Sequence, residues 1–171
     1  MALSDTLTGT VEIKVNPKIT TTEGSILGNR SVAHKILKSM TDGSGSNQAT
    51  GFFSSTFTAA TGGTTISLAD SADPLGGVGD DTPTMDPEGL KLRCILIENK
   101  DSTNFVSVKR GTNGETSILS GATDSIKIVA GGFFLWYSPA GDSAMNDGSD
   151  DELLFTADTA GVSCKLTYIF G

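Results

Sequence analysis

The chain is poor in charged side chains, and most of those it has are acidic. Asp, Glu, Lys and Arg make up 19% of its 171 residues, and the formal net charge is −8. The 12 Lys and Arg residues are scattered rather than clustered. Proteins that bind nucleic acid neutralise phosphates with clustered basic side chains, and anionic membranes attract the same clusters. Direct binding to nucleic acid or to a membrane surface is therefore not expected.

Long apolar runs are missing as well. No stretch approaches the ~18 apolar residues of a membrane-spanning helix. The first residues, Met-Ala-Leu-Ser-Asp-Thr-Leu-Thr, lack the basic start and apolar centre of a secretory signal. We expect synthesis in the cytoplasm and no membrane span.

Histidine and cysteine are scarce: His34, Cys94 and Cys164 are the only ones. These three cannot form a zinc site without added carboxylates. The alternation predicts that Cys94 shares a face of its strand with Leu90, Leu92 and Leu96, and Cys164 lies in a second alternating run. This pattern predicts two free, buried thiols. A disulfide stays the alternative, because sequence does not show whether the two Cα atoms lie within ~7 Å.

Sequence motifs of catalysis are absent too. His34 could serve a Ser-His-Asp system, yet no Gly-x-Ser-x-Gly elbow occurs, and 43–47 is typical of a turn. The glycines of 76–79 are not followed by Lys-Ser or Lys-Thr, so no phosphate loop is indicated. The sequence predicts no catalytic, cofactor-binding or metal-binding residues, and we expect no enzyme.

An acidic cluster lies between Gly141 and Ala160, where no basic residue occurs. Its members are Asp142, Asp147, Asp150, Asp151, Glu152 and Asp158. A calcium loop would explain it, but aligning Gly148 with the invariant glycine places Met145 and Leu154 at ligand positions. Paired carboxylates near Trp136 and Tyr137 could also indicate a glycosidase. A solvated acidic loop is the favoured interpretation.

Ser, Thr and Gly are plentiful instead, and short alternating apolar runs fill the second half of the chain. Runs of this length, separated by Gly, Asp, Asn and Ser, predict an all-β fold. We expect an antiparallel β-sandwich of jelly-roll or immunoglobulin-like type. The run 162–170 alternates without a break and predicts a central core strand. The runs are 90–98, 105–109, 125–129, 133–137, 153–156 and 162–170.

The first part of the chain is organised differently. Residues 10–15 predict a strand, and residues 1–28 an N-terminal strand or arm. Residues 29–41 fit a helix or a strand, with a strand favoured. The single sandwich domain is expected over 29–171. Its long loop at 69–89, rich in Pro and Gly, is the first candidate for contact with a partner.

Two glycine signals predict turns. Asn113-Gly114 indicates a type I′ hairpin turn. Gly131-Gly132 indicates a sharp entry into the aromatic strand 133–137.

Over about 64–171, the order of these segments resembles small β-sandwich virion proteins of tailed bacteriophages, of the capsid decoration or cement type. The resemblance is carried by Gly-Leu-Lys-Leu-Arg-Cys-Ile-Leu-Ile-Glu-Asn at 89–99, Asn-Phe-Val-Ser-Val at 104–108, Ile-Lys-Ile-Val-Ala-Gly-Gly-Phe at 126–133, and the last strand ending at Gly171. The N-terminal 60 residues and individual functional residues are not covered by it.

The resemblance implies a structural protein of the virion, made in the host cytoplasm. Its partner would be the lattice of the major capsid protein, and a homo-oligomer such as a trimer would be expected. Two alternatives stay open: a tail or fibre protein that recognises a host surface, and a coat protein that builds the shell itself.

Overall fold

A computed structural model describes residues 9–15, 18–19, 30–31, 34–70, 86–114, 118–121, 123–141, 144–146, 148–149 and 151–171, with side chains from residue 39 onward. This part of the chain contains strands and no helix, which confirms the predicted all-β class. The strands are β1 (Gly9–Val15), β2 (Lys18–Ile19), β3 (Arg30–Ser31), β4 (His34–Asp42), β5 (Gln48–Ala49), β6 (Gly51–Ala59), β7 (Thr64–Ser67), β8 (Leu92–Asn99), β9 (Val106–Arg110), β10 (Ser125–Ile128), β11 (Phe133–Tyr137), β12 (Glu152–Ala157) and β13 (Val162–Phe170).

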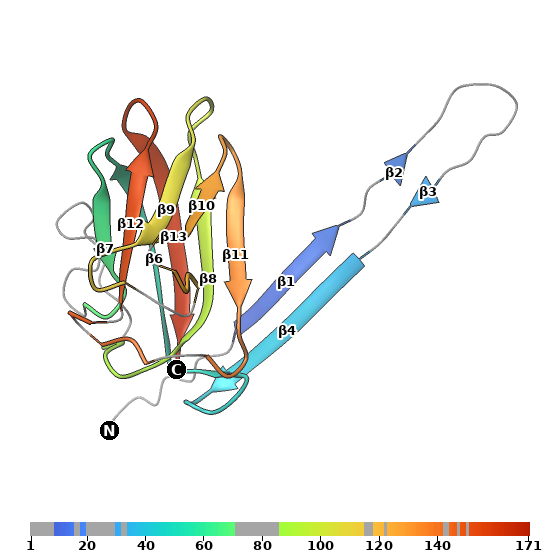
Figure 1. Ribbon diagram of the computed structural model, residues 1–171. Coiled ribbons are helices and arrows are strands. Elements are labelled where there is room, and N and C mark those ends of the chain that lie inside the picture. The colour runs from blue at the N-terminus through green and yellow to red at the C-terminus, as the bar shows by residue number, and fades with distance from the viewer. Residues whose placement is uncertain are drawn as a thin grey trace, which may run out of the picture.

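Two four-stranded antiparallel sheets form the body of the protein, as predicted for a β-sandwich (Figure 1). One sheet has the strand order β10-β9-β12-β7, and the other has the order β11-β8-β13-β6. Each sheet buries one face against the other, so alternate residues of each strand point into a shared core.

The strand pairing identifies the sandwich as a jelly roll. Within residues 51–170, the first strand pairs with the last, the second with the last but one, and so on. The pairs are β6 with β13, β7 with β12, β8 with β11 and β9 with β10. The segment therefore forms one long antiparallel hairpin that is rolled up, so that successive pairs alternate between the two sheets. Eight strands in two such sheets are the jelly-roll arrangement, one of the two predicted types.

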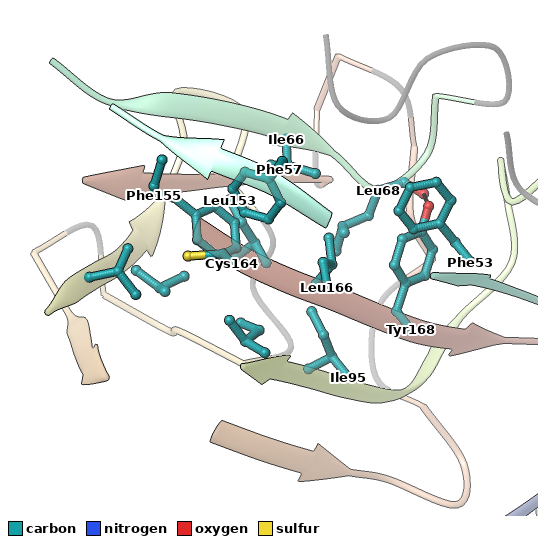
Figure 2. Packing of buried hydrophobic residues seen from close by; sticks show 14 of the residues in the cluster. Phe53, Phe57, Ile66, Leu68, Ile95, Leu153, Phe155, Cys164, Leu166 and Tyr168 are labelled. Atoms are coloured by element: carbon teal, nitrogen blue, oxygen red, sulfur yellow. Dashed lines mark hydrogen bonds between the residues drawn. The ribbon is translucent and has the colours of Figure 1, made fainter. Parts of the chain in front are cut away.

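The strand β13 lies at the centre of the core, as its unbroken alternation predicts. It pairs with β6 on one side and β8 on the other, and every second residue is buried. Figure 2 shows Leu166 and Tyr168 of β13 among side chains of the surrounding strands. The rings of Phe57 and Phe155 meet edge to face across the two sheets, with centroids 4.9 Å apart. The sequence thus specifies the core through its period of two.

A β-bulge in β8 changes which residues face the core. Ile169 pairs with Cys94 and Phe170 pairs with Leu92, so Arg93 is an extra residue in β8. Because one inserted residue reverses the alternation, both Leu92 and Ile95 belong to the core cluster. The prediction that Cys94 shares a face with Leu90, Leu92 and Leu96 was therefore wrong for Leu90 and Leu92, which lie on the core side, while Cys94 and Leu96 both lie on the outer face.

The N-terminal strands form a separate ribbon. The strand β1 pairs with β4 along its whole length, and β2 pairs with β3. Figure 1 shows this ribbon, which we call the arm, leaving the sandwich near the end of β11 and pointing away from both sheets. The extended interpretation of 29–41 is confirmed for its described residues. Because β4 pairs with β1 and with neither large sheet, the arm reaches past residue 28, where the sequence was divided.

The two turn signals have different outcomes. The hairpin prediction at Asn113-Gly114 was wrong: the β9–β10 connection spans 111–124, and the only described non-glycine residue with positive φ is Asn47. A type I′ turn needs positive φ at both central residues. Here the carbonyl of Asn113 instead accepts hydrogen bonds from the amides of Asp151 and Glu152. The prediction for Gly131-Gly132 is confirmed, since Gly131, two residues before β11, has φ +67°.

Candidate functional site

Of the residues considered for catalysis that the structure describes, His34 belongs to β4, whereas Asp151, Glu152 and Asp158 lie in or beside β12. His34 lies opposite Val15 in the arm. Within the described ranges, no group of three His, Cys, Asp or Glu residues could hold a metal ion. No helix in those ranges is long and apolar enough to cross a membrane. Most of the loop predicted at 69–89 lies outside the described residues.

Part of the acidic cluster has a structural role. Asp142, Asp147 and Asp150 lie outside the described residues, but Asp151 is fully buried, so a solvated loop does not describe it. Its carboxylate accepts a hydrogen bond from the Ser67 hydroxyl. Glu152 accepts one from the Asn113 amide (2.9 Å), and Asp158 accepts one from the Thr159 amide (2.9 Å). These carboxylates hold the chain segments at the two ends of β12.

The buried Asp151 lies near the core tyrosine. Tyr168 donates a hydrogen bond to the Leu68 carbonyl (3.0 Å). Burial raises the pKa of the Tyr168 hydroxyl, and the nearby charges of Asp70 and Asp151 raise it further. The hydroxyl therefore stays protonated and acts as a donor, which fits a structural role rather than one in proton transfer.

Both cysteines are free and buried, as predicted. Desolvation by burial raises the pKa of the Cys94 thiol to about 11. It raises the pKa of Cys164 to about 12, with a smaller contribution from the charge of Asp101. Since the thiolate is the reactive form, both side chains are inert in the folded protein.

We expect no reaction of native protein with a thiol reagent and two thiols after denaturation. The unfolded thiols ionise near 9.0 and the folded ones do not until about 11 and about 12. Their contribution to stability is thus complete below pH 9 and declines as the pH rises toward those values. Urea unfolding at several pH values tests this, with a Cys94→Ala, Cys164→Ala double variant as the control that should lose part of the slope. Two thiols that react in the native state would contradict the assignment.

The bulged residue Arg93 fastens the base of the arm to the sandwich. Its side chain is 2% exposed, and its guanidinium donates to the carbonyls of Ser44 (2.7 Å) and Pro139 (3.2 Å). Ser44 follows β4, and Pro139 follows β11. One planar, permanently charged group thus joins the arm to the edge of the β11-β8-β13-β6 sheet.

Other contacts complete this junction. The amide of Asn47 donates to the Pro139 carbonyl (2.8 Å), and the Tyr137 hydroxyl donates to the Asn47 side chain (3.0 Å). Gly171 exchanges two backbone hydrogen bonds with Lys91. A Cβ at Gly171 would meet three backbone atoms of Gly43, Ala49 and Thr50 at 2.9 Å, so only glycine fits there. The arm is therefore held at its base in a defined direction.

The outer face of the β11-β8-β13-β6 sheet carries apolar side chains on all four strands. Strand register aligns Tyr137, Cys94, Ile169 and Phe52 in one row, and Leu135 and Leu96 in the next. Phe133, in a third row beside Glu98, is 65% exposed, and Phe52 is 42% exposed. We call Phe52, Leu96, Phe133, Leu135 and Ile169 the outer-face patch. Contiguous apolar side chains on a sheet surface are typical of a protein-protein contact.

A shallow hollow lies at one end of this face. Its volume is about 270 Å³, and its lining is Glu98, Asn99, Lys100, Gly131, Gly132 and Phe133. Small-molecule pockets usually measure ~300–1,000 Å³ and are deeply enclosed. The hollow is a notch beside the outer-face patch and does not have the form of a ligand pocket.

Sequence reasoning missed Arg93, Asn47 and the outer-face patch. The bulge that buries Arg93 has no sequence signal of its own, while the patch could have been found from Phe133, Leu135 and Tyr137, which alternate on one strand. No protein-family model matches this chain, and comparisons with curated proteins and with solved structures gave no match either. The junction and the patch are therefore interpreted from their geometry alone.

Proposed function

We propose that this chain is a structural virion protein, a decoration or cement protein that binds an assembled phage head and stabilises it. The observation that carries the proposal is the arm. A two-stranded ribbon is marginally stable in water unless a third strand or a packed surface supports it. Among the described residues β1 has only β4 beside it, and the third strand of this sheet, β5, pairs with β4 only at Thr41 and Asp42, at the base. Beyond that base, which Arg93 holds, the arm is two strands wide. An arm of this kind would be stabilised by contact with a neighbouring molecule in an assembly.

The surfaces of the protein support this role. The jelly roll closes its core between two sheets and leaves the outer-face patch as an apolar surface on one of them. Contacts repeated over a lattice add avidity without strong individual interfaces. Binding only to the assembled shell stabilises that state by mass action.

Purified heads that lack this protein provide the test. Adding the protein should raise the temperature at which heads break open, and binding should saturate at a fixed ratio to the major capsid protein. Co-sedimentation followed by quantitative gel analysis measures that ratio. Disassembled capsid subunits are the control and should bind little, because the proposal requires the lattice. Absence of saturable binding to heads would overturn the proposal.

The jelly-roll topology also favours a second candidate, a coat protein that builds the shell itself, since viral capsid domains are among the proteins that use this fold. The two are separated by expression of this chain alone. A coat protein would assemble into closed particles without other viral proteins, whereas a decoration protein would remain as small oligomers.

A further inference from the structure

The arm has an apolar face that continues outward from a buried base. In the antiparallel register, Gly9 lies opposite Met40, Val11 opposite Lys38 and Ile13 opposite Ile36. Residues opposite each other share a face, so one side of the ribbon carries Val11, Ile13, Val15, Ile36 and Met40, together with Lys38 and His34. Met40 is 3% exposed, while Ser39, on the other side, is exposed. At the base of the arm, the buried side is therefore the side that carries most of the apolar residues of the ribbon.

This face extends beyond the sandwich of its own chain. The β1–β4 pairing covers seven residues, or about 23 Å at ~3.3 Å per residue. Figure 1 shows the ribbon directed away from both sheets, so the chain's own sandwich does not cover its outer part. A two-stranded ribbon with one mostly apolar side gains stability from a packed surface, and here another molecule would have to supply that surface.

The charge distribution favours another copy of this chain. Residues 9–41 contain five Lys and Arg residues against two carboxylates, Glu12 and Glu23. The rest of the chain contains seven Lys and Arg residues against eighteen Asp and Glu residues. A basic arm is attracted to an acidic body, whereas two bodies repel each other. A second copy therefore offers both the opposite charge and, on its outer sheet face, an apolar patch.

We propose that the arm of one copy lies on the outer-face patch of a neighbouring copy and links the molecules into a homo-oligomer. The apolar side of the ribbon covers Leu96, Leu135 and Ile169, and Phe133 lies at the margin of the contact. Each molecule provides one arm and one patch, so the contact is heterologous and closes into a ring or, with two copies, is exchanged reciprocally. The biological role of this contact rests on the proposed function, because linked copies would bind a capsid lattice at several points.

Cross-linking between differently labelled copies tests the contact directly. Protein with Ile13→Cys in the arm is mixed with protein carrying Leu135→Cys in the patch and treated with a short bis-maleimide. The native thiols are buried and should not compete. We expect a cross-linked dimer that contains one of each copy. Thr65→Cys is the matched control, because Thr65 is exposed on the outer face of the other sheet. Equal yield with Thr65→Cys, or no mixed dimer, would overturn the proposal.

Sedimentation of the full chain provides the second test. The wild-type protein should sediment as an oligomer at micromolar concentration, and Leu135→Glu should raise the concentration of half-dissociation at least about tenfold. Thr65→Glu should leave it unchanged. If Leu135→Glu does not fold, Phe133→Glu at the 65% exposed margin serves in its place. Because the arm and body carry opposite charge, about 0.5 M salt should also weaken association.

The result separates this inference from the proposed function. A monomeric wild-type protein that nevertheless saturates on heads would overturn the arm-to-patch contact alone. An oligomer that cross-links as expected but does not bind heads would overturn the decoration role and leave the contact standing.

Discussion

Replacing Leu166 by alanine should lower the free energy of unfolding by about 2–5 kcal/mol. Leu166 is fully buried at the middle of β13, between β6 and β8, and belongs to the main core cluster. The substitution removes packed methyl groups and leaves a cavity that central strands cannot easily close. Urea unfolding should show a lower midpoint with an unchanged slope.

Lys165→Ala is the matched control on the same strand. Lys165 lies on the outer face and is partly exposed, so its replacement should change the free energy of unfolding by less than about 0.5 kcal/mol. Equal midpoints for wild-type protein and Leu166→Ala would show that β13 is not the centre of the core.

Arg93→Ala should destabilise the protein by at least about 1.5–3 kcal/mol, the range for one hydrogen bond to a charged group. The buried guanidinium donates to the carbonyls of Ser44 and Pro139, and both part-buried hydrogen bonds would be lost with it. The loss should be concentrated at the arm junction. Hydrogen exchange should therefore accelerate at the amides of Thr41 and Gly43, which donate to carbonyls of Asn47 and Ala49.

Arg110→Ala separates this effect from a general loss of arginine. Arg110 also donates to two backbone carbonyls, those of Gly114 and Ser120, but it lies in the other sheet and does not touch the junction. It should leave the exchange of Thr41 and Gly43 unchanged. Unaltered exchange in Arg93→Ala would mean that the arm is held by other contacts.

The all-β class, the sandwich and the central position of β13 followed from the period of two in the sequence, because a half-buried strand needs that alternation. The alternation of Thr10 to Val15 likewise predicted β1. The choice of jelly roll over the immunoglobulin-like type did not follow, since it depends on which distant strands pair, as β6 does with β13. Such pairings leave no local mark in composition.

Local exceptions account for the errors. The bulge at Arg93 changes which residues of β8 face the core, and no residue in 90–98 predicts a bulge. The Asn113-Gly114 pair is a strong turn signal, but its carbonyl and amide groups are engaged by β12 and by Arg110, so tertiary contacts override the local preference. The strand β4 could be identified as the second strand of the arm only from its pairing with β1, which leaves no signal within residues 29–41.

The proposed function places this protein on the outside of a phage head, and electron cryo-microscopy of phage particles prepared with the protein tests that proposal directly. The account predicts jelly-roll density at regular positions on the outside of the head, in a fixed ratio to the major capsid protein, with each arm lying on a neighbouring copy. Density confined to the tail or its fibres would contradict the account and support recognition of a host surface instead.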